Sequence, residues 1–434
     1  MTDRFAPSHA AARARLAAVR PAAYASSRNH LDGAVTRLSP YLTHGLLSLP
    51  EVAAALAARH ALPLQHKLMQ ELGWREFFHH VWQHRGDAIL ESLHAGPRPD
   101  AAYQRPLPDD IRQARTGVPV IDAAVRTLYA TGWLHNHARM WLASYVVHVR
   151  GVHWRAGADW LVAHLLDGDL ASNHLSWQWI AGTGSHKPYL FNADNVARYA
   201  GNQPGWPSPG SVIDTDYATL DRWAHGTAPL PPAPGAVAGT GIDEPALWHS
   251  LPPDLQADVL ADVQTGVQPG VQPGPQPGPQ PAGWPAPHAL AGRSVWLVHP
   301  WSLAGPPAGA PPDSLCLAVW PAEFHARWPW STARWRFVAA GMAALTRQTM
   351  WAHTAPLQQA LGQAAAVHCT DNGHLPAAWP AAWRQPAPRL LARPPSLCNS
   401  FSQFWRQATG GVGRLPDRPG WLAGGAVQPG LFDD

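Results

Sequence analysis

Residues 116–195 constrain the fold more than any other stretch, because their polar side chains fall on helix faces that should be buried. Pro119 near a helix start and Gly132 just past its end frame one helix. The next helix, expected over residues 134–149, is apolar on nearly every side and should lie inside a bundle. One face of it, at i, i+3, i+4 and i+7, carries Asn136, Arg139, Met140 and Ala143. We therefore expect a guanidinium and an amide to point into the interior, where they need partners.

The expected partner of the arginine is the Asp167-Gly168-Asp169 turn, which should close a third helix (residues 156–166) and open a fourth. Asp169, Asn173 and Trp177 then recur at i, i+4 and i+8 on that fourth helix. A capped turn between helices is the simplest interpretation of such a sequence. However, charged and amide groups that converge in an apolar layer cost free energy unless they satisfy one another or a ligand does, so the pattern also indicates a cofactor site.

Two motifs in this stretch carry a family resemblance: GW-h-H-N-x-x-R-M over residues 132–140 and DGD-x-A-x-N-x-x-x-W-x-W over residues 167–179. Together they resemble the flavin-binding helical domain of the DNA photolyase and cryptochrome family. The resemblance implies FAD as cofactor, with an Arg139–Asp167 ion pair over the flavin ring, Asp169 near its edge and Asn173 facing N5. A second match, over residues 31–45, implies a loop around the flavin diphosphate, in which Val35 replaces a usual threonine. The implied FAD-binding residues are Tyr24, Thr36, Arg37, Leu38, Ser39, Arg75, Asn136, Arg139, Asp167, Asp169 and Asn173.

The substrate side rests on the amphipathic helix expected over residues 65–85, which places Glu71 and Arg75 on one stripe with Trp74 beside it. A solvated Glu–Arg pair is the simplest interpretation. The resemblance implies instead that Glu71 hydrogen-bonds damaged bases, Trp74 stacks on them and Arg75 contacts the flavin. Flipped bases do need an aromatic face and polar partners. The substrate-binding residues implied are Glu71, Trp74, Asn136, Met140 and Trp179, and Asn136 with Met140 favours the cyclobutane pyrimidine dimer.

Electron transfer should involve Trp177 and Trp154, which match the proximal and middle tryptophans of the family's photoreduction chain. The position of the distal tryptophan holds Ile111, for which Trp141 or Trp160 could substitute. The residues expected to act in repair are thus Trp154, Trp177, Glu71, Asn136 and Met140.

Composition adds limits on localisation and partners. The net charge of +3 gives no argument for nucleic-acid binding by itself. The three cysteines lack metal-ligand spacing, so no metal is expected, and they fit a reducing cytoplasm. No apolar run is long enough for a membrane span. We expect a cytoplasmic monomer that contacts damaged DNA and no membrane.

Residues 1–225 should form the helical FAD-binding domain, residues 226–290 a flexible Pro/Gly-rich linker with one short helix at most (244–263), and residues 291–434 a small α/β domain. The fold class is thus mostly α, followed by a Rossmann-like domain. Short apolar runs at 294–298, 315–320 and 364–369 and a helix over 330–347 indicate a parallel layer. This region loosely resembles the family's antenna domain, displaced to the other end of the chain; its chromophore is unknown.

The expected function is light-driven repair of cyclobutane pyrimidine dimers by a deoxyribodipyrimidine photo-lyase. The rival is a cryptochrome-like photoreceptor that binds FAD without repair, for which Val35, Ile111, Tyr189 and the displaced domain leave room. A third class, a flavin-free DNA-binding or scaffold protein, predicts a colourless preparation.

Overall fold

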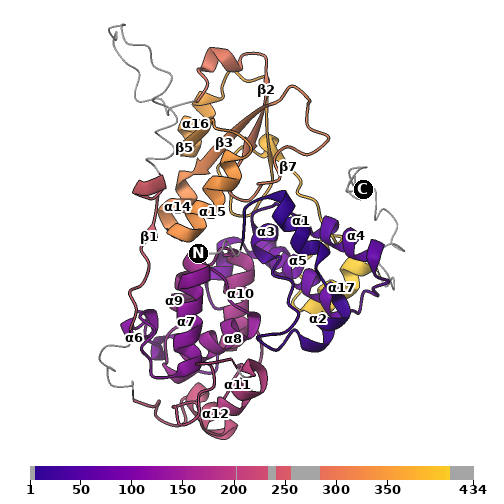
Figure 1. The fold of residues 1–434 in the computed structure, drawn as a ribbon. Coiled ribbons are helices and arrows are strands. Elements are labelled where there is room, and N and C mark those ends of the chain that lie inside the picture. The colour runs from indigo at the N-terminus through magenta and orange to yellow at the C-terminus, as the bar shows by residue number, and fades with distance from the viewer. Residues whose placement is uncertain (1–4, 202, 233–240, 256–283, 411–434) are drawn as a thin grey trace.

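The computed structural model describes residues 5–201, 203–232, 241–255 and 284–410. It places a helical part, formed by the first half of the chain, beneath a smaller α/β part that contains residues 294–385 (Figure 1). The mostly helical fold with a parallel sheet is therefore confirmed. None of the helices in the described ranges is both long and apolar enough to cross a membrane.

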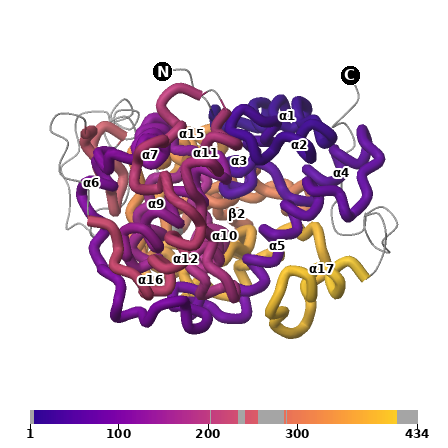
Figure 2. Tube along the Cα trace, turned by 90° about the horizontal axis from the view of Figure 1, so that it is seen from below, coloured from indigo at the N-terminus to yellow at the C-terminus, as the bar shows by residue number. Residues whose placement is uncertain are grey.

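The N-terminal helices surround one long helix, α5, which runs over Lys67–Arg85. The expected start at residue 65 is two residues early, because His66 caps the helix by accepting a hydrogen bond from the Leu68 N–H. The shorter helices around it are α1 (His9–Ala17), α2 (Pro21–Ser27), α3 (Ser39–Thr43) and α4 (Leu49–Arg59). Helix α2 packs on α5, and so does α17 (Phe401–Thr409) from the far end of the chain (Figures 1 and 2).

The central bundle contains the two motif helices. Helix α7 (Pro119–Thr131) ends at Gly132 in the left-handed conformation, as the Pro-in, Gly-out pattern predicts. The helix expected over 134–149 is shorter: α8 covers Asn136–Ser144, and a π-helical turn, η3, covers Tyr145–Val149. Helix α9 (Trp154–His164) and helix α10 (Leu170–Ala181) follow, and α10 packs on α9, α5 and α8. Helices α11 (Ala193–Ala200) and α12 (Tyr217–His225) complete the bundle.

The α/β part is built on a five-stranded sheet in the order β5-β3-β2-β6-β7, and every neighbouring pair is parallel. Parallel strands need crossover connections, which here include the helices α14, α15 and α16. Strand β2 has the expected bounds, and β3 and β6 lie within two residues of them. The strands are β2 (Ser294–Val298), β3 (Leu315–Pro321), β5 (Thr349–Ala352), β6 (Ala366–Thr370) and β7 (Arg384–Gln385), and the helices are α14 (Ala322–Arg327), α15 (Thr332–Ala343) and α16 (Thr354–Ala360).

Part of the predicted linker contacts both the helical part and the α/β part. Strand β1 (Leu247–Trp248) pairs antiparallel with β4 (Trp330–Ser331), and the Glu244 carboxylate contacts Arg112 at 2.8 Å and His164 at 2.9 Å. Within the stretch 244–263, for which one short helix at most is expected, residues 247–248 form strand β1 and residues 253–255 are helical. The Val-Gln-Pro-Gly repeat at 267–283 lies outside the described residues.

Candidate flavin site

The Asp167–Asp169 turn joins α9 to α10 and lies where the helical and α/β parts meet. Its local role is the simple one: the Asp169 side chain caps α10 by accepting the Ser172 N–H at 2.8 Å. The same carboxylate also receives charge partners from α5, His79 at 3.0 Å and Arg75 at 3.4 Å. The helix cap and a buried charge cluster therefore coincide.

Asp169 is the most strongly perturbed carboxylate of the site. It is only 1 % exposed, and burial by itself raises its pKa. The charges of His79 and Arg75 outweigh burial and hold the pKa of Asp169 well below its ordinary range. The turn therefore carries a fixed negative charge.

The expected Arg139–Asp167 pair is present. One nitrogen of the Arg139 guanidinium reaches both carboxylate oxygens, at 2.7 and 3.0 Å, and Nε donates to the Leu134 carbonyl at 3.0 Å. Arg139, expected to point into the interior, is only partly buried, because a quarter of its side chain is exposed. Its neighbour on the same face, Asn136, is exposed as well, because it is the first residue of α8 and lies at the edge of the bundle. Arg139 thus stands at the boundary between the bundle core and solvent.

The predicted diphosphate loop closes on the start of the α7–α8 connection. Arg37 has φ 51° and places its guanidinium 4.9 Å from the ring centre of Trp133, whose Nε1 donates to the Ser39 hydroxyl at 3.3 Å. Thr36 and Leu38 belong to the same segment, and the Thr36 hydroxyl accepts the Leu38 N–H at 3.4 Å. Two hydroxyls and a guanidinium are therefore gathered here, a donor set that suits phosphate oxygens.

Helix α5 presents the predicted substrate residues, but their partners differ from the simple i, i+4 pair. Glu71 lies 3.9 Å from Arg28, the C-cap residue of α2, while Arg75 turns to Asp169. Although 47 % of the Glu71 side chain is exposed, the surrounding protein removes enough hydration to raise its pKa. Tyr24, one helical turn before Arg28, also has a raised pKa because it is largely desolvated, with the Glu71 charge as the second cause.

Trp74 has an aromatic partner that its sequence neighbourhood does not indicate. Its ring is stacked on Phe401 of α17, with centroids 4.2 Å apart and planes 9° apart. One face of the indole is therefore covered, and base stacking stays a prediction for the other face. The remaining predicted substrate residues are accessible: Trp179 is 42 % exposed, and the exposed Asn136 contacts Met140, amide nitrogen to sulfur, at 3.4 Å.

The two predicted electron-transfer tryptophans are buried side chains of α9 and α10. Trp177 is packed so closely on Gly157 that a Cβ there would lie 2.3 Å from the indole. Trp154 donates its Nε1–H to the Ser92 hydroxyl at 3.0 Å. Ile111 and Trp141 are fully buried, and Trp160 is buried at 7 % exposure. Neither indole proposed as a substitute is therefore a surface residue.

Several residues of the turn's surroundings were missed by the sequence interpretation. His79 follows Arg75 by one helical turn, so the face of α5 could have indicated it. His44 could not have been found that way: its ring nitrogens lie 2.7 Å from the Leu166 carbonyl and 2.6 Å from the Pro300 carbonyl. Arg334 and His374 come from the α/β part and also have no local signal.

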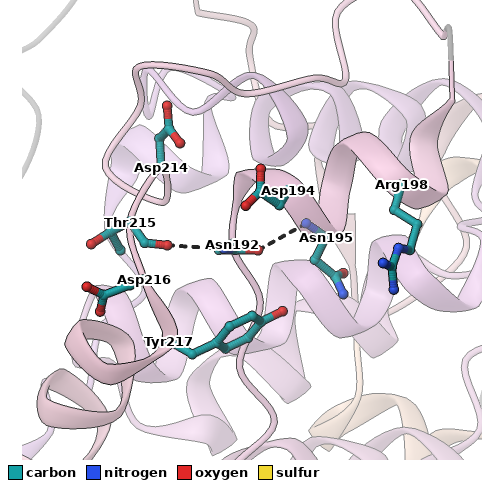
Figure 3. A pocket seen from close by; sticks show the side chains of 8 residues that line it. All are labelled: Asn192, Asp194, Asn195, Arg198, Asp214, Thr215, Asp216 and Tyr217. Atoms are coloured by element: carbon teal, nitrogen blue, oxygen red, sulfur yellow. Dashed lines mark hydrogen bonds between the residues drawn. The ribbon is translucent and has the colours of Figure 1, made fainter.

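A pocket of about 490 Å³ lies elsewhere, between α11 and the start of α12 (Figure 3). Three of its polar side chains have structural partners: Asp216 caps α12, Asp214 accepts the Gly210 N–H at 2.7 Å, and Asn192 caps α11. None of the predicted flavin or substrate residues lines it. In the described ranges, no group of three or more His, Cys, Asp or Glu side chains could hold a metal ion.

Comparison with known proteins bears on the central bundle. Residues 68–203 match the model of the FAD binding domain of DNA photolyase. The chain is similar to deoxyribodipyrimidine photo-lyases of Streptomyces griseus (38 % identity over 37 % of this chain and 35 % of the relative) and of Thermus thermophilus (34 % over 45 % and 50 %). It is also similar to a cryptochrome DASH of Oryza sativa, with 34 % identity over 37 % of this chain and 29 % of that protein.

The matches cover only part of these relatives: the chain spans between about a third and a half of the photo-lyases named. Among solved structures, a bacterial class III photolyase from Agrobacterium tumefaciens aligns over 52 % of this chain and 56 % of that one, at 25 % identity and a TM-score of 0.41.

Proposed function

We propose that this protein is a light-driven DNA photolyase that acts on cyclobutane pyrimidine dimers, because residues 68–203 match the model of the FAD binding domain of DNA photolyase. The observation that carries the proposal is the arrangement around the Asp167–Asp169 turn. There, two carboxylates with separate cationic partners meet the helix that bears Asn173.

The residues present fit an FAD molecule by their chemistry. A flavin dinucleotide combines an anionic diphosphate with a ring system whose edges donate and accept hydrogen bonds, and the site supplies Arg37, Thr36 and Ser39 for the former. The Ser172 hydroxyl, beside the Asp169 cap, is a buried polar atom without a hydrogen-bond partner in the structure. Bound reduced FAD would supply a light-excited electron, chemistry that no side chain provides.

Around the ring, the chain's own residues set orientation and charge. Asn173 is held in place because its amide nitrogen donates to the Ala158 carbonyl of α9 at 2.9 Å. Its amide oxygen is thereby kept as an acceptor for a ring N–H. The Arg139–Asp167 pair has no net charge, so the electrostatic potential at the ring depends mainly on Asp169 and its two partners on α5. Asn173 would thus orient the ring, while the Asp169 cluster would set the charge around it.

On the substrate side, Glu71, Trp74, Asn136 and Met140 would hold a dimer flipped out of the duplex. Desolvation raises the pKa of Glu71, whose carboxyl group would form a hydrogen bond to the damaged bases. Extrusion costs a few kcal/mol, less for a damaged pair than for an intact one, which favours the lesion.

The test uses purified full-length protein loaded with FAD, reduced, and mixed with an oligonucleotide that contains one cyclobutane dimer. Blue light should restore the intact bases, and dark samples should not. Glu71→Ala, which removes the hydrogen-bonding group, should slow repair by about tenfold, the loss expected for one hydrogen bond. The exposed Glu91→Ala serves as the matched control and should repair normally. Full flavin loading without any repair would refute the proposal.

A cryptochrome-like photoreceptor is the second candidate, and one observation favours it. The Trp74 face covered by Phe401 reduces the aromatic surface open to a base. If this candidate is right, the FAD-loaded protein binds dimer-containing and undamaged DNA equally, and illumination changes the flavin spectrum without repair. Asn173→Ala separates both candidates from a flavin-free protein, because it should alter the spectrum of the reduced flavin in either.

A further inference from the structure

The helix ends on both sides of the Asp167–Asp169 turn need partners that the helices cannot supply. The last carbonyls of α9 and the first N–H groups of α10 have no partner within their own helix. Asp169 satisfies one N–H of α10. Two side chains of the α/β part satisfy others, and they approach the turn from opposite ends.

Arg334 of α15 covers the α9 end. It is 1 % exposed and donates to the Val162 carbonyl at 3.2 Å and to the Gly168 carbonyl at 2.6 Å. Its guanidinium lies 4.0 Å from the ring centre of Trp330. Burial lowers the pKa of Arg334 to about 9, an effect that the charges of Asp167 and Asp169 partly offset. A buried cation is costly, and the carbonyl end of a helix is a place that compensates for it.

His374 covers the α10 end. Its Nε2 accepts the Leu170 N–H at 3.2 Å, and its Nδ1 lies 2.7 Å from the Asn372 amide oxygen. Because a backbone N–H can only donate, Nε2 is an acceptor and Nδ1 carries the proton, so the ring is neutral. Trp301 stacks on it with centroids 4.8 Å apart and planes 9° apart, and Trp82 of α5 contacts its edge. The ring therefore has one orientation, with Nε2 at 3.8 Å from an Asp169 oxygen.

Between the contacts of Arg334 and His374, the backbone has no room for a side chain at position 168. A Cβ on Gly168 would lie 2.3 Å from the Val162 carbonyl oxygen and 2.5 Å from an Arg334 nitrogen. The turn can therefore pass between α9 and Arg334 only with glycine at its centre. Any movement of Arg334 would change where the two flanking carboxylates lie.

We propose that Arg334 and His374 are positioning residues of the flavin site, through which the α/β part fixes the Asp167–Asp169 turn. This inference rests on the proposed FAD-binding function and deepens it. The α/β part is thus a structural component of the site, whatever pigment it carries. Neither side chain needs to touch FAD; each acts through the backbone of the turn.

Arg334→Met removes the two hydrogen bonds to the Val162 and Gly168 carbonyls, and His374→Phe removes the acceptor of the Leu170 N–H. Both are compared with His374→Gln, whose amide oxygen can still accept the Leu170 N–H. Arg336→Met is the matched control, because Arg336 is on the same helix, 61 % exposed and paired with Asp254. Leu357→Ala controls for stability, because Leu357 is fully buried in α16 of the same α/β part. Arg334→Lys replaces Arg334→Met should the latter not fold.

Two readouts are taken on full-length protein: amide hydrogen exchange of residues 167–173 without FAD, and the Kd and absorption spectrum of added FAD. Arg334→Met and His374→Phe should accelerate exchange in this segment and raise the Kd by about tenfold or more, with an altered flavin spectrum. His374→Gln should restore most of both properties, and Arg336→Met should change neither. The inference is overturned if Leu357→Ala, at an equal loss of Tm, weakens FAD binding as much. If the wild type binds no FAD, the proposed function fails, and with it the flavin part of this inference. Amide hydrogen exchange then still tests whether Arg334 and His374 hold the Asp167–Asp169 turn in place.

Discussion

Acidification should destabilise this protein through histidines that are buried in the neutral form. His148 of η3 and His299, which follows β2, are 2 % and 0 % exposed, and burial lowers the pKa of each to about 4. His299 has both ring nitrogens engaged, Nε2 to the Thr370 carbonyl at 2.8 Å and Nδ1 as acceptor of the Trp301 N–H at 3.3 Å. In the unfolded chain these histidines take up protons below about pH 6.5, whereas in the folded protein they stay neutral until about pH 4. The free energy of unfolding therefore falls as the pH drops from about 6.5 to about 4.

The magnitude follows from the two pKa values. Between pH 7 and pH 5, a histidine with a pKa of about 6.5 unfolded and about 4 folded lowers the free energy of unfolding by about 2 kcal/mol. The pair therefore accounts for about 4 kcal/mol, a large fraction of the stability of an ordinary domain.

Urea unfolding followed by tryptophan fluorescence, at pH 7 and pH 5, measures this loss. Other buried histidines contribute as well, so the informative quantity is the difference from His148→Gln, whose side chain does not titrate. That variant should lose about 2 kcal/mol less than the wild type on acidification. His353→Gln, at a position that is 64 % exposed, should behave like the wild type. If His148→Gln and the wild type lose stability equally, the burial argument is refuted.

Three further substitutions test close contacts in the helical part. Gly73→Ala would place its Cβ 2.1 Å from the Trp405 ring; the overlap costs about 1–3 kcal/mol against about 1 kcal/mol gained in helix propensity, so urea unfolding should show a small net loss and α17 should become more susceptible to proteolysis. Gly157→Ala would press on Trp177 in the same way and should slow photoreduction of bound flavin, as flash absorption can measure; an unchanged rate would argue against Trp177 as the proximal donor. Asp169→Asn keeps the helix cap but removes the charge, so the free energy of unfolding measured in urea should fall by about 2–4 kcal/mol. An unchanged free energy of unfolding would show that the Asp169 charge is not needed to compensate Arg75 and His79.

Local signals were enough to predict the elements of the site. The Pro-in, Gly-out pattern located α7, the spacing of apolar residues located α5 to within two residues, and β2 was predicted at its observed bounds. The Arg139–Asp167 contact was also expected, because the resemblance pairs these two positions. Each of these features depends on residues that are close in sequence or on a motif of fixed spacing.

What could not be predicted depends on contacts between distant parts of the chain. Nothing near Trp74 indicates that Phe401 will cover it, and nothing near the turn indicates Arg334. The exposure of Asn136 was mispredicted because an apolar helix was assumed to be buried along its whole length, whereas α8 begins at that residue. Periodicity reports which face of a helix is apolar, not how far each end projects from the bundle.

The separation of Leu170 and His374 by 204 residues also has a consequence for biosynthesis. At about 5–20 residues per second, translation needs about 10–40 s to supply the histidine after the leucine has been added. During that interval the nascent bundle holds an aspartate turn without its two outer supports. Tight flavin binding would therefore be expected late, once residue 374 has left the ribosome, and a chain arrested before that point should bind flavin more weakly.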